Sequence, residues 1–158
     1  VGLAVPLYIN WPKIRSQWLP SITSQLAGSI TGLITCLYFA QSLAAEREVV
    51  LSLAAKSVTN PIALEITRSI GGIPAITAAT VILAGMMGQM IGFKLLSSST
   101  VGPPTSQSIA LGTASHAMGI ASAMERSRKF AAYASLGLIF NGVLTAILAP
   151  LLIPLLGI

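Results

Sequence analysis

The sequence predicts an all-α integral membrane protein, a bundle of transmembrane helices in which two helices are interrupted. Of its 158 residues, 54% are hydrophobic and 8% are charged, whereas soluble domains carry about a quarter charged residues. Three uncharged runs, 16–45, 69–93 and 130–158, exceed the roughly 20 residues that a membrane-spanning helix needs. Polar stretches at 53–62 and 112–119 interrupt two further helix-sized apolar segments.

The few charged residues lie near the ends of the apolar segments. The net charge is +5, but the basic residues form no stripe with interleaved aromatic side chains, as a nucleic-acid surface requires. Cys36 is the single cysteine, so neither a disulfide framework nor a cysteine metal site is available. The sequence therefore predicts no nucleic-acid partner, no metal ion and no cofactor.

The chain begins with the apolar segment 1–9, which is too short to span a membrane and suits the end of a longer helix. We therefore expect residues 1–158 to form a single transmembrane domain that lacks N-terminal helices of a longer protein. The first full span is predicted at 19–43, with Trp18 at the membrane interface. Gly28 and Gly32 form a small-xxx-small step, which is typical of close helix packing.

The remaining elements alternate between interrupted and continuous segments. The segment 49–68 contains the first polar stretch and is followed by a continuous span at 73–96. The segment 97–104 is uncharged and rich in turn formers, so we expect a loop there. The second interrupted segment is 105–124, and the final span is 130–152.

The basic residues indicate which end faces the cytoplasm, because loops on that side carry an excess of Lys and Arg. The strongest basic cluster is 125–129. If every segment crosses the membrane, Arg15 and Arg68 fall on the same side as this cluster. The net acidic segment 45–48 then lies outside, and Lys94 falls on the outer side as well.

The two interrupted segments are related by a shift of 58 residues, and a continuous span follows each copy. Paired interrupted segments at corresponding positions are the best sequence pointer to a transporter binding site. If both segments cross fully, the two copies are parallel, whereas re-entrant segments would make them inverted. The shift superposes Leu53, Ser57, Ile62, Ala63, Arg68 and Ser69 on Leu111, Ser115, Ile120, Ala121, Arg126 and Ser127.

Lys56 is the most informative residue of the first polar stretch. A charge near the middle of a membrane costs about 2.5–3.5 kcal/mol on insertion scales, so its retention without a partner or a function is not expected. Three explanations remain open: a ligand role toward an anionic substrate, an ion pair with an acid such as Glu65, and a side chain that snorkels to the interface.

The neighbours of this lysine favour the ligand role. Pro61 removes a backbone donor and predicts a break or unwinding near Asn60, which frees backbone groups to face something polar. Ser57, Thr59 and Asn60 can donate to a carboxylate, and a half-helix that starts after Pro61 would aim its positive dipole end at the same place.

The second polar stretch holds the only histidine. His116 lies between Gly112 and Gly119, which give close backbone access, and Thr113 and Ser115 precede it. Its role is either substrate or proton handling, since an unperturbed imidazole titrates near pH 6.5, or structural hydrogen bonding. Ser115 beside His116 has neither a G-x-S-x-G elbow nor an evident acid to complete a triad, so we do not expect an enzyme.

These motifs resemble those of the LrgB/CidB family. The segment 56–63, Lys-Ser-Val-Thr-Asn-Pro-Ile-Ala, is similar to the family's K-S-V-T-T-P-I-A. The segments 71–75 and 112–116 are similar to G-G-I-P-A and G-T-A-S-H, at family-like spacing. The likeness covers essentially the whole chain, and family members generally carry further N-terminal helices.

The resemblance implies two functions of different classes. The family includes the plant plastid glycolate/glycerate translocator. This member implies secondary transport of a small monocarboxylate such as glycolate, glycerate or pyruvate, either with or without proton coupling. Its bacterial members are described as holin- or antiholin-like regulators of murein hydrolase export and cell lysis. The expected setting is a bacterial inner membrane, or the plastid inner envelope for a plant protein, with an LrgA/CidA-type membrane protein or further copies of the chain as partners.

A pore-former has no need for a lysine at a broken helix, so the sequence favours the transporter. Lys56 would then be the counter-charge, and the other residues of the two polar stretches would complete the site. The expected substrate-binding residues are Lys56, Ser57, Thr59, Asn60, Pro61, Gly112, Thr113, Ser115, His116 and Gly119.

Overall fold

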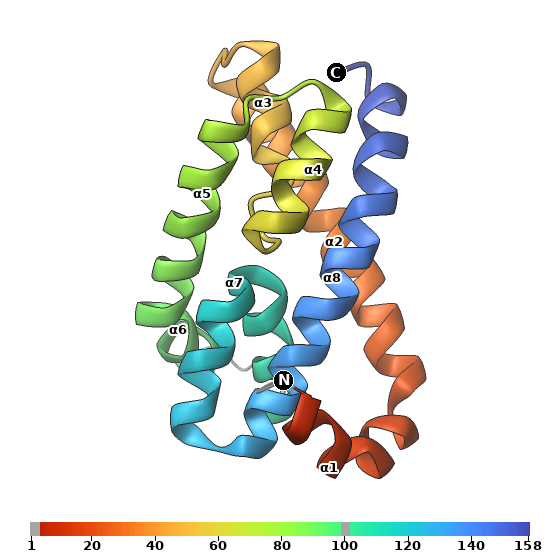
Figure 1. Ribbon diagram of the computed structural model, residues 1–158, viewed down its shortest axis with the longest axis vertical. Helices are drawn as coiled ribbons and strands as arrows, with labels where there is room; N and C mark the ends of the chain where they lie inside the picture. Colours follow the sequence, from red (N-terminus) through yellow and green to blue (C-terminus); the bar gives the residue numbers. More distant parts are fainter. Residues whose placement is uncertain (1–3, 99–101) are drawn as a thin grey trace.

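The computed structural model describes residues 4–98 and 102–158, and every regular element within them is a helix. Among these residues, three stretches are long and apolar enough to cross a membrane: α2 (Trp18–Ser42), the stretch Pro74–Ser98 and α8 (Arg128–Leu155). They run along the long axis of the molecule (Figure 1). The prediction of an all-α membrane protein is confirmed.

The N-terminal helix α1 (Ala4–Ser16) lies at one end of the bundle (Figure 1). The sequence led us to expect a helix end at 1–9; residues 1–3 lie outside the described residues, and the helix continues through Pro12 to Ser16. α2 follows almost directly and leads to the opposite end of the molecule.

The first interrupted segment is a hairpin that does not cross the bundle. α3 (Arg47–Leu53) enters from one end, residues 54–59 form turns, and α4 (Asn60–Ile70) returns to that same end (Figure 1). Pro61 lies in the first turn of α4, where a missing backbone N–H costs nothing. The proline therefore begins the returning helix instead of kinking a continuous one. We call residues 47–70 the first hairpin.

The span that follows is continuous in extent but not uniformly α-helical. It consists of α5 (Pro74–Met87), a π-helical turn η1 (Gly88–Gly92) and α6 (Phe93–Ser98). Ser52 of the first hairpin accepts a hydrogen bond from the Ile73 amide at 2.7 Å, so the start of the span is tied to the hairpin. Of the expected loop at 97–104, residues 99–101 lie outside the described residues.

The second interrupted segment is also a hairpin. α7 (Pro104–Arg126) reverses direction at His116, whose φ of 42° and ψ of −130° are non-helical. Gly119 consequently packs back on Leu111: a Cβ at Gly119 would lie 2.6 Å from the Leu111 carbonyl oxygen. Arg126 lies with its guanidinium 4.3 Å from the centre of the Phe93 ring, near the end of the preceding span. We call residues 104–126 the second hairpin.

α8 returns through the whole length of the molecule (Figure 1). Ser127 is its N-cap, and the Ser127 hydroxyl accepts a hydrogen bond from the Lys129 amide at 3.2 Å. The helix extends past the expected end at residue 152 to Leu155, and both Pro150 and Pro154 lie inside it.

The two copies of the repeat are inverted. Each consists of a hairpin followed by a span, and the two hairpins enter the bundle from opposite ends (Figure 1). Because neither hairpin crosses, the expected sides of two basic residues are wrong. Arg68 lies at the end of the molecule where the first hairpin begins, and Lys94 lies beside Phe93 at the end where the second begins.

Candidate functional site

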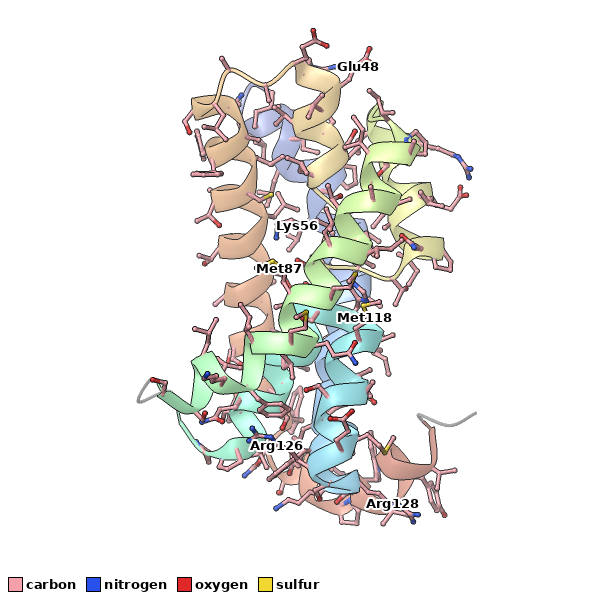
Figure 2. All side chains as sticks on the ribbon, turned by 90° about the vertical axis from the view of Figure 1, so that its left-hand side faces the viewer. Glu48, Lys56, Met87, Met118, Arg126 and Arg128 are labelled. Carbon is pink, nitrogen blue, oxygen red and sulfur yellow. The ribbon has the colours of Figure 1, made fainter. Side chains whose placement is uncertain are left out.

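The tips of the two hairpins meet near the middle of the molecule. Figure 2 shows Lys56 between the end that carries Glu48, which we call the acidic end, and the end that carries Arg126 and Arg128, which we call the basic end. A cavity of about 170 Å³ lies at the tips and is lined from α2, both hairpins and α8. Its polar lining side chains are those of Ser29, Lys56, Ser57, Thr113, Asn141 and Thr145.

The ammonium group of Lys56 has a neutral partner. Its Nζ donates to the Ser57 hydroxyl at 3.2 Å. Glu65, the acid that the sequence offered as a counter-ion, forms an ion pair with Arg68 on the exposed face of α4 instead. None of the four acidic residues of the chain lines the cavity. The cavity therefore presents a positive charge that no acidic side chain of this chain neutralises.

Asn141 of α8 joins the two hairpin tips. Its Nδ2 donates to the Ser57 carbonyl at 2.9 Å and to the Thr113 carbonyl at 3.1 Å. Its Oδ1 accepts from the Ser29 hydroxyl at 2.8 Å. Asn141 is 2% exposed, and each hairpin break leaves carbonyls without helical partners. One amide side chain thus satisfies a carbonyl from each hairpin and holds the tips together.

The residues of the first polar stretch fall into two groups. Lys56 and Ser57 line the cavity, whereas Thr59, Asn60 and Pro61 form the N-cap and first turn of α4 and are not among the lining residues. Asn60 Oδ1 is buried and has no hydrogen-bond partner among the described residues. The N-terminus of α4 points toward the middle of the molecule, as the anion-site argument from sequence requires.

Of the predicted site residues in the second polar stretch, Thr113 alone lines the cavity. Gly112 packs its backbone against the backbone of Ala134 in α8, and a side chain at that position would collide with it. Ser115 is 2% exposed and packs against Gly88 of the π-helical turn. Gly112, Ser115 and Gly119 therefore build the hairpin, and the structure does not bring them to the cavity.

His116 lies at the reversal of the second hairpin and faces α5. Its ring is buried, and Nε2 donates to the Val81 carbonyl at 2.9 Å. A carbonyl oxygen can only accept, so Nε2 carries the hydrogen. The ring packs beside Gly85 and is not among the residues that line the Lys56 cavity. Of the two roles that the sequence left open, this contact supports structural hydrogen bonding.

Sequence reasoning missed the residues that α2 and α8 contribute. Ser29, Cys36, Asn141 and Thr145 lie in spans that the sequence led us to treat as scaffold. The sequence does contain a signal for Asn141. It is a strongly polar amide in the uncharged run 130–158, and such side chains form hydrogen bonds between membrane helices. No three His, Cys, Asp or Glu side chains within 4–98 and 102–158 gather closely enough to hold a metal ion.

Gly28 and Gly32 were expected to pack against another helix, and this prediction is wrong. A Cβ at either position would meet no atom within 4 Å. Both glycines line the Lys56 cavity instead, so the missing side chains leave open space beside the lysine.

Two inverted hairpins that meet at a half-buried cavity lined by a lysine define a membrane protein with a central polar site. The chain belongs to the LrgB-like family, which matches residues 1–155. No solved structure matches the chain.

Curated relatives cover nearly the whole chain. An uncharacterized protein of Haemophilus influenzae is 35% identical over 150 residues, which are 95% of this chain and 65% of that protein. A Bacillus cereus protein named antiholin-like protein LrgB is 34% identical over 157 residues, which are 99% of this chain and 68% of that protein. A Bacillus anthracis protein of the same name has the same identity and coverage. The chain thus spans about two thirds of the length of these relatives.

Proposed function

We propose that this chain forms the binding core of a secondary transporter for a small monocarboxylate in a bacterial cytoplasmic membrane. The observation that carries the proposal is Lys56 in a cavity between inverted hairpin tips, without an acidic side chain in the lining. A cation retained at mid-membrane indicates a functional partner. Inverted repeats with broken helices at a central site are a recurring design of transporters.

The chemistry of the cavity supports a small anionic solute. Lys56 supplies the counter-charge, and the hydroxyls of Ser57 and Thr113 supply donors to a carboxylate. The volume of about 170 Å³ is several times the roughly 30 Å³ share of a water molecule in the liquid. It lies well below the about 300–1,000 Å³ of pockets for drug-sized ligands. Glycolate, glycerate and pyruvate belong to the size class that such a cavity accepts.

His116 is not part of the anion site that we propose. Proton coupling through its imidazole stays a prediction from the sequence, because the ring contacts α5 and not the cavity. Thr59, Asn60 and Pro61 contribute the N-terminus of α4 rather than lining side chains.

The test is uptake of labelled glycolate, glycerate and pyruvate by proteoliposomes. Lys56→Met should lower uptake about tenfold or more, because a charge-assisted hydrogen bond contributes about 1.5–3 kcal/mol. Arg68→Met is the matched control: it removes a basic side chain that is exposed and paired with Glu65, and it should leave uptake unchanged. Equal uptake by the wild-type protein and Lys56→Met would exclude this lysine as the counter-charge.

The second candidate is an antiholin-like regulator of cell lysis, and the names of the Bacillus relatives favour it over carboxylate transport. A regulator of that kind needs no solute in the Lys56 cavity. If wild-type proteoliposomes take up none of the three carboxylates while the protein alters autolysis in cells, this second function is the correct one.

A further inference from the structure

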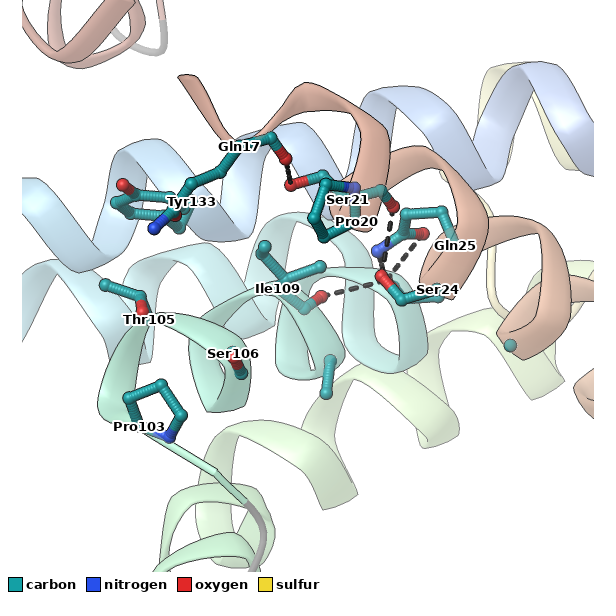
Figure 3. Close-up of a pocket in the computed structure, with 13 residues that line it drawn as sticks. Gln17, Pro20, Ser21, Ser24, Gln25, Pro103, Thr105, Ser106, Ile109 and Tyr133 are labelled. Carbon is teal, nitrogen blue, oxygen red and sulfur yellow. Dashed lines mark hydrogen bonds between the residues drawn. The ribbon is translucent and has the colours of Figure 1, made fainter. Parts of the chain in front are cut away.

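A second and larger cavity lies between the Lys56 cavity and the basic end. It measures about 560 Å³ and is lined by the first half of α2 and the first arm of α7, each with its N-cap residue, and by one residue of α8 (Figure 3). Its side chains include many hydroxyls and amides, and none of them is charged. Among its polar side chains are those of Ser21, Ser24, Gln25 and Thr113.

The two cavities share part of their walls. Gly28 and Thr113 line both of them, so the larger cavity reaches the smaller one between α2 and α7. Gln25 stands at this junction with a side chain that is only 3% exposed. Its Nε2 lies 2.7 Å from the Thr113 hydroxyl, and that hydroxyl also lies 2.9 Å from Gln25 Oε1. This side-chain contact spans the junction from one helix to the other.

The other half of the molecule is packed with apolar side chains. Leu37, Val50 and Leu51 are at most 1% exposed and belong to one continuous hydrophobic cluster between the Lys56 cavity and the acidic end. Ala149 and Ile153 of α8 complete the cluster on that side. The polar route to Lys56 thus lies on the side of the basic end.

We propose that the larger cavity is the path by which a small anion reaches Lys56 from the basic end, and that the Gln25–Thr113 pair is the gate of this path. The inference rests on the proposed function for the identity of its solute. The gate is a contact between two neutral groups, which separate more easily than an ion pair. As it opens, the same amide and hydroxyl become donors to a passing carboxylate.

Cys36 gives a direct test, because this single cysteine lines the Lys56 cavity. The probe is a small, membrane-impermeant anionic methanethiosulfonate, applied to a protein whose only thiol is Cys36. Inverted membrane vesicles expose the cytoplasmic face, and right-side-out cells expose the opposite face. With the basic end in the cytoplasm, Cys36 should react much faster in inverted vesicles.

The gate predicts how this rate responds to substitution. Gln25→Ala removes the contact with Thr113 and should raise the labelling rate about fivefold, the equivalent of one neutral hydrogen bond. Ser24→Ala is the matched control: Ser24 lines the same cavity, but its hydroxyl donates to Ser21 in its own helix. Gln25→Asn, which keeps the amide but is too short for the contact, serves if Gln25→Ala fails to fold.

Two results would overturn the proposal: labelling that is as fast or faster from the acidic end, and a rate in Gln25→Ala and Gln25→Asn no higher than in Ser24→Ala. The experiment needs no transported solute. If the protein labels as expected but takes up no carboxylate, the result supports the path and the gate and contradicts only the carboxylate substrate of the proposed function.

Discussion

Asn141 illustrates how much of this architecture depends on single polar side chains. An amide offers two donors and an acceptor, and Asn141 uses both sides: Nδ2 bonds a carbonyl from each hairpin and Oδ1 bonds Ser29. Asn141 is 2% exposed, and a carbonyl that loses a hydrogen-bond donor in such surroundings costs free energy. The stability of the hairpin tips should therefore depend on this residue more than on any hydroxyl of the cavity.

We expect Asn141→Leu to lower the free energy of unfolding by about 2–4 kcal/mol, since it leaves two part-buried carbonyls without this donor at about 1–3 kcal/mol each. Denaturation in mixed micelles, followed by circular dichroism, measures the loss. Thr145→Val is the control, because Thr145 makes only a long 3.4 Å contact to Asn141 Oδ1, and it should cost less than about 1 kcal/mol. Equal losses for both variants would contradict the assigned role.

At the scale of elements, the second hairpin depends on close backbone approach. Its two arms touch where Gly119 meets the Leu111 carbonyl, and its first arm meets α8 where Gly112 meets Ala134. Glycine permits both contacts because it has no Cβ. His116, at the reversal, has a positive φ that residues other than glycine rarely adopt, and its bond to Val81 fixes the reversal against α5.

Two glycine substitutions separate this packing effect from helix propensity. Both Gly119→Ala and Gly28→Ala introduce a residue that helices favour by about 0.5–1 kcal/mol, but only the first creates a contact shorter than 3 Å. We expect Gly119→Ala to destabilise by about 1–3 kcal/mol and Gly28→Ala to be neutral or slightly stabilising. Thermal unfolding in detergent compares them, and a stable Gly119→Ala protein would show that the arms lie farther apart.

For the whole molecule, the inverted repeat redistributes the charges between the two membrane faces. Lys94, Arg126 and Arg128 lie at the basic end, whereas Arg68 shares the acidic end with Glu48. The excess of basic residues at the basic end still predicts that this end faces the cytoplasm. The inversion follows from the hairpins alone. The first hairpin returns to the end at which it began, the next span then crosses the molecule once, and the second hairpin therefore starts from the opposite end.

Sided labelling of introduced cysteines tests this topology. In a Cys36→Ala background, Lys94→Cys and Arg128→Cys should react with an impermeant maleimide from the same face, and Arg68→Cys should react from the other face. The chemical reason is accessibility alone, since a charged maleimide does not cross the bilayer. Labelling of Arg68→Cys together with Arg128→Cys would mean that the first interrupted segment crosses the membrane after all.

Much of this arrangement is predictable from local sequence, and the remainder is not. Apolar length defines the spans, and Pro61 locates the first break because its effect on the backbone is local. Whether a broken segment continues or turns back depends on tertiary contacts such as that of His116 with Val81, which leave no trace in the motif. For the same reason the sequence identified Lys56 but not Asn141 or Gln25, whose partners lie 28 or more residues away along the chain.

The half-length hairpins also have an electrical consequence. Lys56 lies between the acidic end and the basic end of the molecule (Figure 2), so we expect it to lie well inside the membrane. A full elementary charge crossing 100 mV gains or loses about 2.3 kcal/mol, so an anion moving from the basic end to Lys56 samples part of that. If the proposed solute enters from a cytoplasmic basic end, a negative interior favours its movement to the lysine and raises its occupancy severalfold. On the proposed function, the membrane voltage would then favour binding from the cytoplasm and oppose binding from outside.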